Sequence, residues 1–235
     1  MPHEEMTISK LFDLDRTAAK PLLKNFTYPW EVLPLIGEFI LGLGETLSKS
    51  EYERRDGNVW ISRSAKLYPN IYIAGPAIIG PNTEVRPGAF IRGNALIGAD
   101  CVVGNSTEVK NAIFFDGAQA PHYNYIGDSV LGYKAHTGAG AITSNLKQDH
   151  SAVTVRTENG RIPTGLRKFG AILGDSAEIG CGCVLNPGTV IGRHARVYPL
   201  SMVRGYVPGF SIYKHAGEIT GIREKGKEGC PCSTQ

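Results

Sequence analysis

The chain has 235 residues, of which 42% are hydrophobic, and its net charge of +3 is too small and too scattered to indicate a nucleic-acid or membrane-surface protein. Its 29 glycines exceed average usage and, with 14 prolines, indicate many turns rather than long helices. The longest apolar run, residues 33–43, is about half the length of a membrane span, and no secretory signal is visible. The five cysteines lack the spacing of a disulfide scaffold. Together these features favour a cytoplasmic, reduced protein.

Residues 1–58 lack the repeat that dominates the rest of the chain. Residues 7–23 and 28–53 predict two short helical segments, the second beginning at Pro29 and interrupted by Pro34. A stack of repeats leaves its first unit exposed, and repeat arrays usually begin with an atypical capping unit. We therefore expect residues 1–58 to form a helical N-terminal cap.

From Ile61 onward a large apolar side chain stands at every sixth position. These positions are Ile61, Leu67, Ile73, Ile79, Val85, Ile91, Ile97, Val103, Val109 and Phe115, and later Leu173, Ile179, Leu185, Ile191, Val197 and Val203. A small residue usually follows four positions after each of them. A hexad with one large and one small inward residue is typical of one corner of a triangular prism, and three hexads close one coil. The sequence therefore predicts an all-β hexapeptide-repeat parallel β-helix over residues 59–208, followed by a short helical or irregular tail, residues 209–235.

The cysteines fit this architecture. Cys101 and Cys183 occupy the small inward position, where a free cysteine behaves as a compact hydrophobe. Cys230 and Cys232 form a lone C-x-C in the tail, which is weak evidence for a metal site.

The repeat is disturbed in two places. In "QAPHYNYIGDSVLG", residues 119–132, one residue is missing from the six-residue spacing, and a second five-residue step follows from Ile126 to Leu131. Such an irregularity can re-aim a side chain, as a β-bulge does, so this stretch predicts an active site around His122. The other disturbance is an inserted polar loop at about residues 146–169, whose basic content suits either an anionic ligand or a solvated surface.

The stretches "VRPGAFIRG", "VGNSTEVKNA", "APHYNYIGDSVLG" and "GAGAITSN" resemble the acetyltransferase half of the bacterial bifunctional UDP-N-acetylglucosamine pyrophosphorylase/glucosamine-1-phosphate N-acetyltransferase. The resemblance covers about residues 79–205. It implies a left-handed β-helix that forms a homotrimer, active sites between subunits and acetyl-CoA as acyl donor. No Gly-rich nucleotide-binding fingerprint occurs in residues 1–60, so we expect no pyrophosphorylase activity.

The resemblance also implies roles for single residues. By its motifs, His122 is the catalytic base, Arg86 and Lys110 hold the sugar phosphate or uridine diphosphate, Tyr125 and Asn145 contact the sugar, and Ala139 and Cys181 contact acetyl-CoA. This chain departs from the family at three places. His136 replaces an asparagine of the family's sugar pocket. Three larger residues, Tyr198, Pro199 and Leu200, replace small residues beside the cofactor. The family has a short loop that carries a lysine where this chain has its long loop, so Lys147 or Lys168 could replace that lysine.

The chemistry of acyl transfer from a thioester to an amine matches these residue types. The amine must lose a proton, which an imidazole can accept near neutral pH, and a backbone N–H can stabilise the thioester oxygen as it becomes negative. Arg86 can bind a phosphate through two parallel hydrogen bonds, and Lys110 can bind it as a point charge. The expected mechanism is direct attack with His122 as general base and no metal.

Two other functions remain open. One is a non-catalytic module that binds nucleotide sugars or assembles subunits, which the altered cofactor edge and the enlarged loop favour. The other is a metalloenzyme of the γ-carbonic-anhydrase type with His122, His136 and His150 as ligands, although their even spacing does not reproduce the closely spaced histidine pair of that family.

Overall fold

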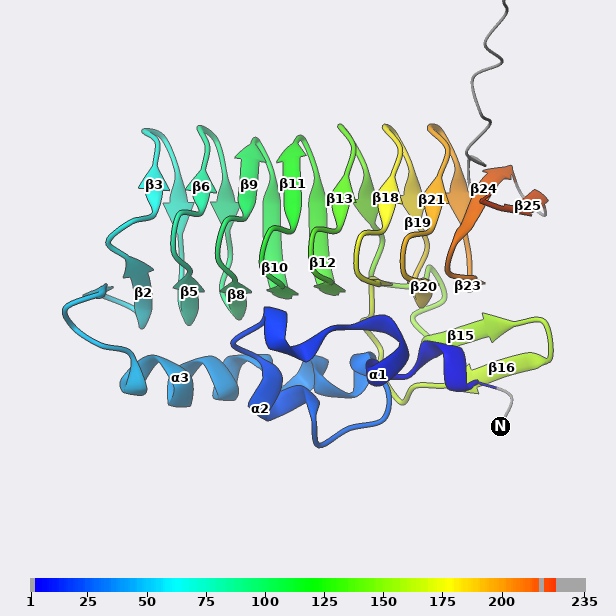
Figure 1. The fold of residues 1–235 in the computed structure, drawn as a ribbon, viewed down its shortest axis with the longest axis horizontal. Helices are drawn as coiled ribbons and strands as arrows, with labels where there is room; N and C mark the ends of the chain where they lie inside the picture. Colours follow the sequence, from blue (N-terminus) through cyan, green and yellow to red (C-terminus); the bar gives the residue numbers. More distant parts are fainter. Residues whose placement is uncertain (1–2, 216–217, 223–235) are drawn as a thin grey trace, which may run out of the picture.

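The computed structural model describes residues 3–215 and 218–222 as a rod of stacked β-coils with short helices along one long side (Figure 1). Each coil adds one short strand to each of three parallel ladders, and the ladders form the faces of a triangular prism. This architecture is a left-handed parallel β-helix, so the predicted all-β fold class is confirmed. None of the helices in the described residues is long and apolar enough to span a membrane.

The three faces run the length of the rod. Face 1 consists of β2 (Val59–Ser62), β5 (Ala77–Ile79), β8 (Ala95–Ile97), the second halves of β10 (Glu108–Phe114) and β12 (Tyr125–Leu131), β17 (Ala171–Leu173), β20 (Thr189–Ile191) and β23 (Tyr206–Val207). Face 2 consists of β3 (Lys66–Leu67), β6 (Glu84–Val85), β9 (Val102–Asn105), β11 (Gln119–His122), β13 (His136–Thr137), β18 (Glu178–Ile179), β21 (Arg196–Val197) and β24 (Ser211–His215). Face 3 consists of β4 (Tyr72–Ile73), β7 (Phe90–Ile91), the first halves of β10 and β12, β14 (Ile142–Thr143), β19 (Val184–Leu185) and β22 (Met202–Val203). Two antiparallel strands, β1 (Tyr52–Arg55) and β25 (Glu218–Gly221), flank the first and last coils.

The interior of the prism is filled by the residues that the hexad repeat predicts. The side chains of Ile79, Val85 and Ile91, one from each face, are fully buried in one continuous core. Cys101 and Cys183 are buried in the same core, as expected. Burial raises the pKa of the Cys101 thiol to about 12, which makes it a poor nucleophile at neutral pH.

The spacing of the repeat changes at a different place from the one predicted. Phe114, rather than the expected Phe115, faces the core, because Phe114 pairs with Ile97 and lies only five residues after Val109. The step from Ile126 to Leu131 is also five residues long, as expected.

Both short steps turn the edge between faces 3 and 1. Their corner residues are Asn111 and Asp128, each with a φ of 48°. His122 itself keeps the regular register, opposite Asn105 of the preceding coil. The missing residue therefore re-aims the side chains around Asn111 and Asp128, and the interpretation that it displaces His122 is wrong.

The N-terminal segment lies along face 1 rather than on the first coil (Figure 1). Its elements are η1 (Glu4–Met6), α1 (Ile8–Leu11), η2 (Leu14–Arg16), α2 (Lys20–Leu23), η3 (Pro29–Leu35) and α3 (Ile36–Thr46). The reason is that the outward side chains of face 1 are apolar and would otherwise meet water. They are Trp60, Ile78, Leu96, Ile113, Val130, Ile172 and Val190, and all of them are buried in one cluster with this segment and with Val153, Val155 and Phe169 of the inserted segment. The predicted helices are present, but the expected end cap is a side cover.

Two further segments differ from the expectation. The inserted loop contains a β-hairpin of β15 (Thr154–Thr157) and β16 (Gly160–Pro163). The parallel ladder continues past residue 208, because β24 pairs with β21 and Tyr213 faces the core. The described part of the tail is therefore strand, and Cys230 and Cys232 lie outside the described residues.

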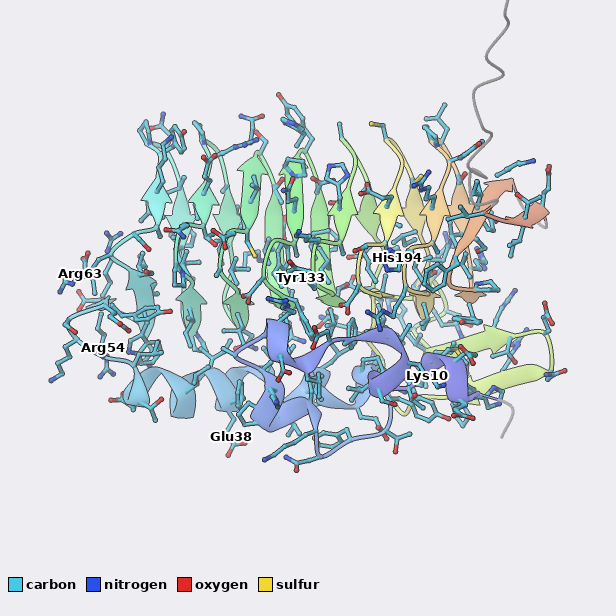
Figure 2. The ribbon with its side chains drawn as sticks, in the orientation of Figure 1. Lys10, Glu38, Arg54, Arg63, Tyr133 and His194 are labelled. Carbon is cyan, nitrogen blue, oxygen red and sulfur yellow. The ribbon has the colours of Figure 1, made fainter. Side chains whose placement is uncertain are left out.

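We expect Trp30 to be a main anchor of the cover, because its side chain is only 2% exposed and its ring stacks on Tyr28 and approaches Phe169. Trp30→Ala should lower the free energy of unfolding by about 3–5 kcal/mol. Glu38→Ala, on the outer side of the same segment (Figure 2), should change it by less than about 0.5 kcal/mol. Urea unfolding followed by circular dichroism measures both, and equal effects of the two variants would contradict the packing described.

Candidate functional site

A group of polar side chains gathers where the two shortened corners meet face 3. The carboxylate of Asp128 accepts a hydrogen bond from Asn111 Nδ2 at 2.8 Å and another from Asn145 Nδ2, and Lys110 Nζ lies 3.5 Å from its Oδ2. Asn145 Nδ2 also lies 3.1 Å from the hydroxyl of Tyr125. We call these five residues, Lys110, Asn111, Tyr125, Asp128 and Asn145, the polar cluster.

Asp128 organises the polar cluster. It is 5% exposed, and a buried carboxylate is tolerated only when cations and hydrogen-bond donors compensate it. Lys110 and the two asparagine amides provide that compensation, while the partly exposed ammonium of Lys110 keeps donors free for a ligand. The cluster is therefore held in shape by one buried charge.

Tyr125 is a hydrogen-bond donor in this environment. Burial raises the pKa of its phenol, and the negative charges of Asp128 and Glu108 raise it further. The phenol stays protonated at neutral pH, so its O–H can donate to a ligand while its oxygen accepts from Asn145. This geometry suits a polyhydroxylated ligand such as a sugar.

His122 lies at the corner between faces 2 and 3, three residues before Tyr125. Its backbone N–H donates to Asn124 Oδ1 at 3.0 Å, and the Asn124 amide in turn donates to the carbonyl of Gly138 at 2.8 Å. The backbone of this corner is thus fixed, whereas the exposed imidazole makes no hydrogen bond within the described residues. The ring is available to a ligand.

Arg86 occupies the same edge as His122, about two coils earlier. At the usual strand spacing that places it about 10 Å away along the rod. Its Nε lies 3.2 Å from Glu84, so an acid partly neutralises it. Within a single chain, Arg86 and Lys110 are not brought together.

Arg92 is a cation that the sequence reasoning missed. It follows β7 on face 3, its backbone N–H donates to the Val109 carbonyl, and its guanidinium lies 2.6 Å from Glu108. The signal was present in "FIRG", where an arginine follows a face 3 strand directly beside the lysine of "EVKN".

The structure places His136 away from the polar cluster. It stands on face 2, where its Nδ1 lies 3.1 Å from Glu178 Oε2. Because Tyr125 and Asn145 belong to face 3, His136 does not share their site within one chain. It could meet them only across a subunit contact.

Ala139 and Cys181 follow His122 along the edge between faces 2 and 3. Both residues are exposed. Backbone hydrogen bonds join the successive coils at this edge, from Gly182 N–H to the Ala139 carbonyl and from Leu200 N–H to the Cys181 carbonyl. Leu200, 85% exposed, crowds the C-terminal end of this edge. The edge presents backbone and small side chains first, and a bulky one last.

The three histidines that a metal site would need stand apart: His122 at a corner, His136 on face 2 and His150 in the inserted segment. Within residues 3–215 and 218–222 no group of three or more His, Cys, Asp or Glu side chains is arranged to hold a metal ion.

We predict that Asp128→Asn destabilises the protein. The new amide would present a donor to the donors of Asn111, Asn145 or Lys110, and losing charged hydrogen bonds in a buried place should cost about 1–3 kcal/mol of unfolding free energy. Asp100→Asn is the matched control, since Asp100 is also a corner residue with positive φ but is exposed. Chemical unfolding of both variants measures the effect, and a loss for Asp128→Asn no larger than that of the control would contradict its organising role.

Comparison with known proteins gives a consistent family signal. The family described as "GMPPB C-terminal domain" matches residues 72–166. The bifunctional sugar-1-phosphate nucleotidylyltransferase/acetyltransferase of Sulfurisphaera tokodaii is 35% identical over 159 residues, which cover 66% of this chain and 40% of that protein. The bifunctional protein GlmU of Methanococcus vannielii is 33% identical over 169 residues, covering 71% of this chain and 41% of that protein.

Among solved structures, a putative acetyltransferase of Bacillus cereus has a TM-score of 0.43 and 14% identity, with 71% of this chain and 78% of that chain covered. The chain spans about two fifths of the length of the two bifunctional relatives. Over its β-helix, it resembles the acetyltransferase half of these bifunctional nucleotidyltransferase–acetyltransferase proteins.

Proposed function

We propose that this chain is an acetyl-CoA-dependent N-acyltransferase that acts on an amino sugar phosphate or a nucleotide sugar. The observation that carries the proposal is the exposed imidazole of His122, to which the described residues offer no hydrogen-bond partner, at the corner that precedes Tyr125 of the polar cluster. A base thus stands at one border of face 3, and a phenol donor and a cation stand further along the same face; these are the groups that an amino sugar phosphate needs. The resemblance to the bifunctional acetyltransferases supports the same class of reaction.

The reaction proceeds by direct attack. The acceptor amine attacks the thioester carbonyl, so that an N–C bond forms and the C–S bond breaks. His122 takes the proton that the amine loses, and a proton is returned to the coenzyme A thiolate. Lys110, Tyr125 and Asn145 hold the sugar, and Lys110 with the neighbouring Arg92 holds its phosphate, to which Arg86 of a neighbouring copy can add a second guanidinium.

The acyl donor extends along the edge formed by Ala139 and Cys181. Small side chains there let a pantetheine arm approach the backbone, whose N–H groups can stabilise the oxyanion. Leu200 and Tyr198 narrow the far end of this edge. That narrowing is the specific observation in favour of the second candidate function, a non-catalytic module that binds nucleotide sugars.

The N-terminal segment serves as the cover of face 1 and contributes no Gly-rich loop at the start of a helix. We therefore assign no pyrophosphorylase reaction to this stretch of chain.

The functional unit is a homotrimer in this proposal. Face 1 is covered by the N-terminal segment and face 2 carries polar ladder residues such as Gln119, Glu178 and Arg196. Face 3 instead exposes large apolar side chains in one register, interrupted by Glu108, which pairs with Arg92. They are Tyr72, Phe90, Ile142 and Met202. Packing face 3 against a neighbour would bury this row and bring His136 of one copy towards Tyr125 of another.

We expect light scattering to give a mass of about three times the 25.4 kDa chain. Met202→Glu, which places a charge in the apolar row, should shift the mass towards the monomer because burying an unpaired charge is costly. Glu38→Lys, on the outer side of the N-terminal segment that covers face 1 (Figure 2), should leave the mass unchanged. A monomeric wild type, or dissociation by the Glu38 variant instead, would overturn this assembly.

The proposed reaction is tested by thiol release from acetyl-CoA with glucosamine-1-phosphate as acceptor. His122→Asn should lower kcat by about 10²–10⁴, as expected for loss of a general base. His194→Asn is the matched control, because His194 stacks on Phe210 at a distant corner and touches none of the site residues. Equal rates for the two variants would refute the role of His122.

A binding readout separates the two candidate functions. Acetyl-CoA should protect the exposed Cys181 thiol from alkylation, whereas buried Cys101 should stay unmodified with or without it. Peptide mapping by mass spectrometry reports each cysteine separately. Protection without turnover would point to a different acceptor, and absence of both would favour the non-catalytic module.

A further inference from the structure

The inserted segment forms a strongly basic pocket against the last coils of the rod. The pocket has a volume of about 440 Å³ and is lined by Lys147 and Arg156, by Arg161 from β16, and by Asn186 and Arg204 from the edge between faces 3 and 1. We call it the basic pocket. Its one acidic lining residue is Asp149, which lies 3.8 Å from Lys147 and accepts hydrogen bonds from Ser151. In the part of the chain that the structure describes, none of the three arginines pairs with a carboxylate.

The hairpin itself brings two of these charges together. Arg156 and Arg161 are directly opposite each other in the antiparallel ladder, so their side chains leave the same face of the hairpin. Like charges at opposite positions destabilise a strand pair. A sequence under no other constraint would place an acid at one of the two positions.

The hairpin cannot move away to relieve this repulsion, because it is docked tightly on the rod. Val153 and Val155 are fully buried. Gly188 and Gly205, with φ of 81° and 79°, let β15 approach the backbone of the rod closely. A Cβ atom at Gly205 would lie 2.5 Å from the Arg156 carbonyl oxygen, and a Cβ atom at Gly188 would lie 2.7 Å from the Thr154 carbonyl oxygen. The arginines are therefore held close to Arg204 by the packing of the backbone.

We propose that the basic pocket binds a diphosphate group. Guanidinium groups bind phosphate oxygens through paired, parallel hydrogen bonds, and several of them fixed around one cavity match an anion that carries several charged oxygens. Binding would remove the repulsion between Arg156 and Arg161 and satisfy Arg204 at the same time. A single carboxylate would leave most of these donors unused.

The place of the pocket indicates which molecule carries the diphosphate. Ser144 and Leu146, two further lining residues, flank Asn145 of the polar cluster. Asn186 and Arg204 follow on the next two coils of the same edge, about 5–10 Å further along the rod. A sugar in the polar cluster could thus extend its diphosphate into the basic pocket, which points to a nucleoside-diphosphate sugar; this assignment of the carrier rests on the proposed function.

The test is calorimetric titration of the full chain with inorganic pyrophosphate at low ionic strength. Arg156→Gln/Arg161→Gln should weaken binding by about tenfold or more, and Arg204→Gln, on the rod rather than the hairpin, should weaken it as well. Arg54→Gln/Arg63→Gln removes the same charge at the opposite end of the rod (Figure 2) and should change the affinity by less than about twofold. Thermal melting of each variant without ligand shows whether it is folded.

Absence of saturable pyrophosphate binding to the wild type, or an equal loss in the control variant, would overturn the proposal. Competition then identifies the carrier: displacement of pyrophosphate by UDP assigns the pocket to a nucleotide sugar, and displacement by coenzyme A alone assigns it to the acyl donor. Failure of the proposed function is distinguishable, because it would appear as pyrophosphate binding without any acetyl transfer. The reverse result, acetyl transfer without pyrophosphate binding, would refute the proposed role of the basic pocket and would not affect the proposed acetyl-transfer reaction.

Discussion

Closure of each coil by three tight corners is the constraint on which the rest of the structure depends. A parallel ladder of two- or three-residue strands can continue only if the chain turns sharply after each strand, and a left-handed residue makes that turn. Asn82, Ser106 and Tyr123 all have φ between 51° and 56°. Asparagine adopts this conformation readily, whereas a tyrosine is strained there. Such bulky left-handed corners recur along the rod at Lys134, Leu200 and Phe210, as well as at Tyr123, which directly follows His122.

Shortening a corner changes what the corner can hold. With five residues instead of six, the turns at Asn111 and Asp128 are so short that β10 and β12 each continue without a break from face 3 onto face 1. The side chains at these corners are then half-buried or buried, and only a mutually satisfied polar set is stable there. Asp128 and Lys110 supply the charges of that set, and Asn145 links it to the next coil. The polar cluster is thus a consequence of the missing residues in the repeat.

The sequence predicts the regular part of this protein well, because a six-residue period follows directly from three-sided coils. It could not decide between Phe114 and Phe115, since both are apolar and one packs inward and the other against the cover. The cover was recognisable in principle from Trp60, Ile78 and Leu96, spaced by whole coils on the outward side. The family motifs located Lys110 and Asn145, but no local signal brings Arg204 beside the hairpin arginines, because that contact depends on how the insert folds back.

Functional groups in such a rod must arise where the repeat is broken, because a regular ladder presents the same shallow surface on every coil. Here three features border face 3: the two shortened corners and the insert with its basic hairpin lie on its edge with face 1, and the exposed His122 corner lies on its edge with face 2. Face 3 lies between them and keeps an apolar row that a second copy can cover. A convex rod becomes a binding cleft only when something packs beside it. The insert provides that wall within the chain for an anion, and a neighbouring subunit would provide it for the sugar and the thioester.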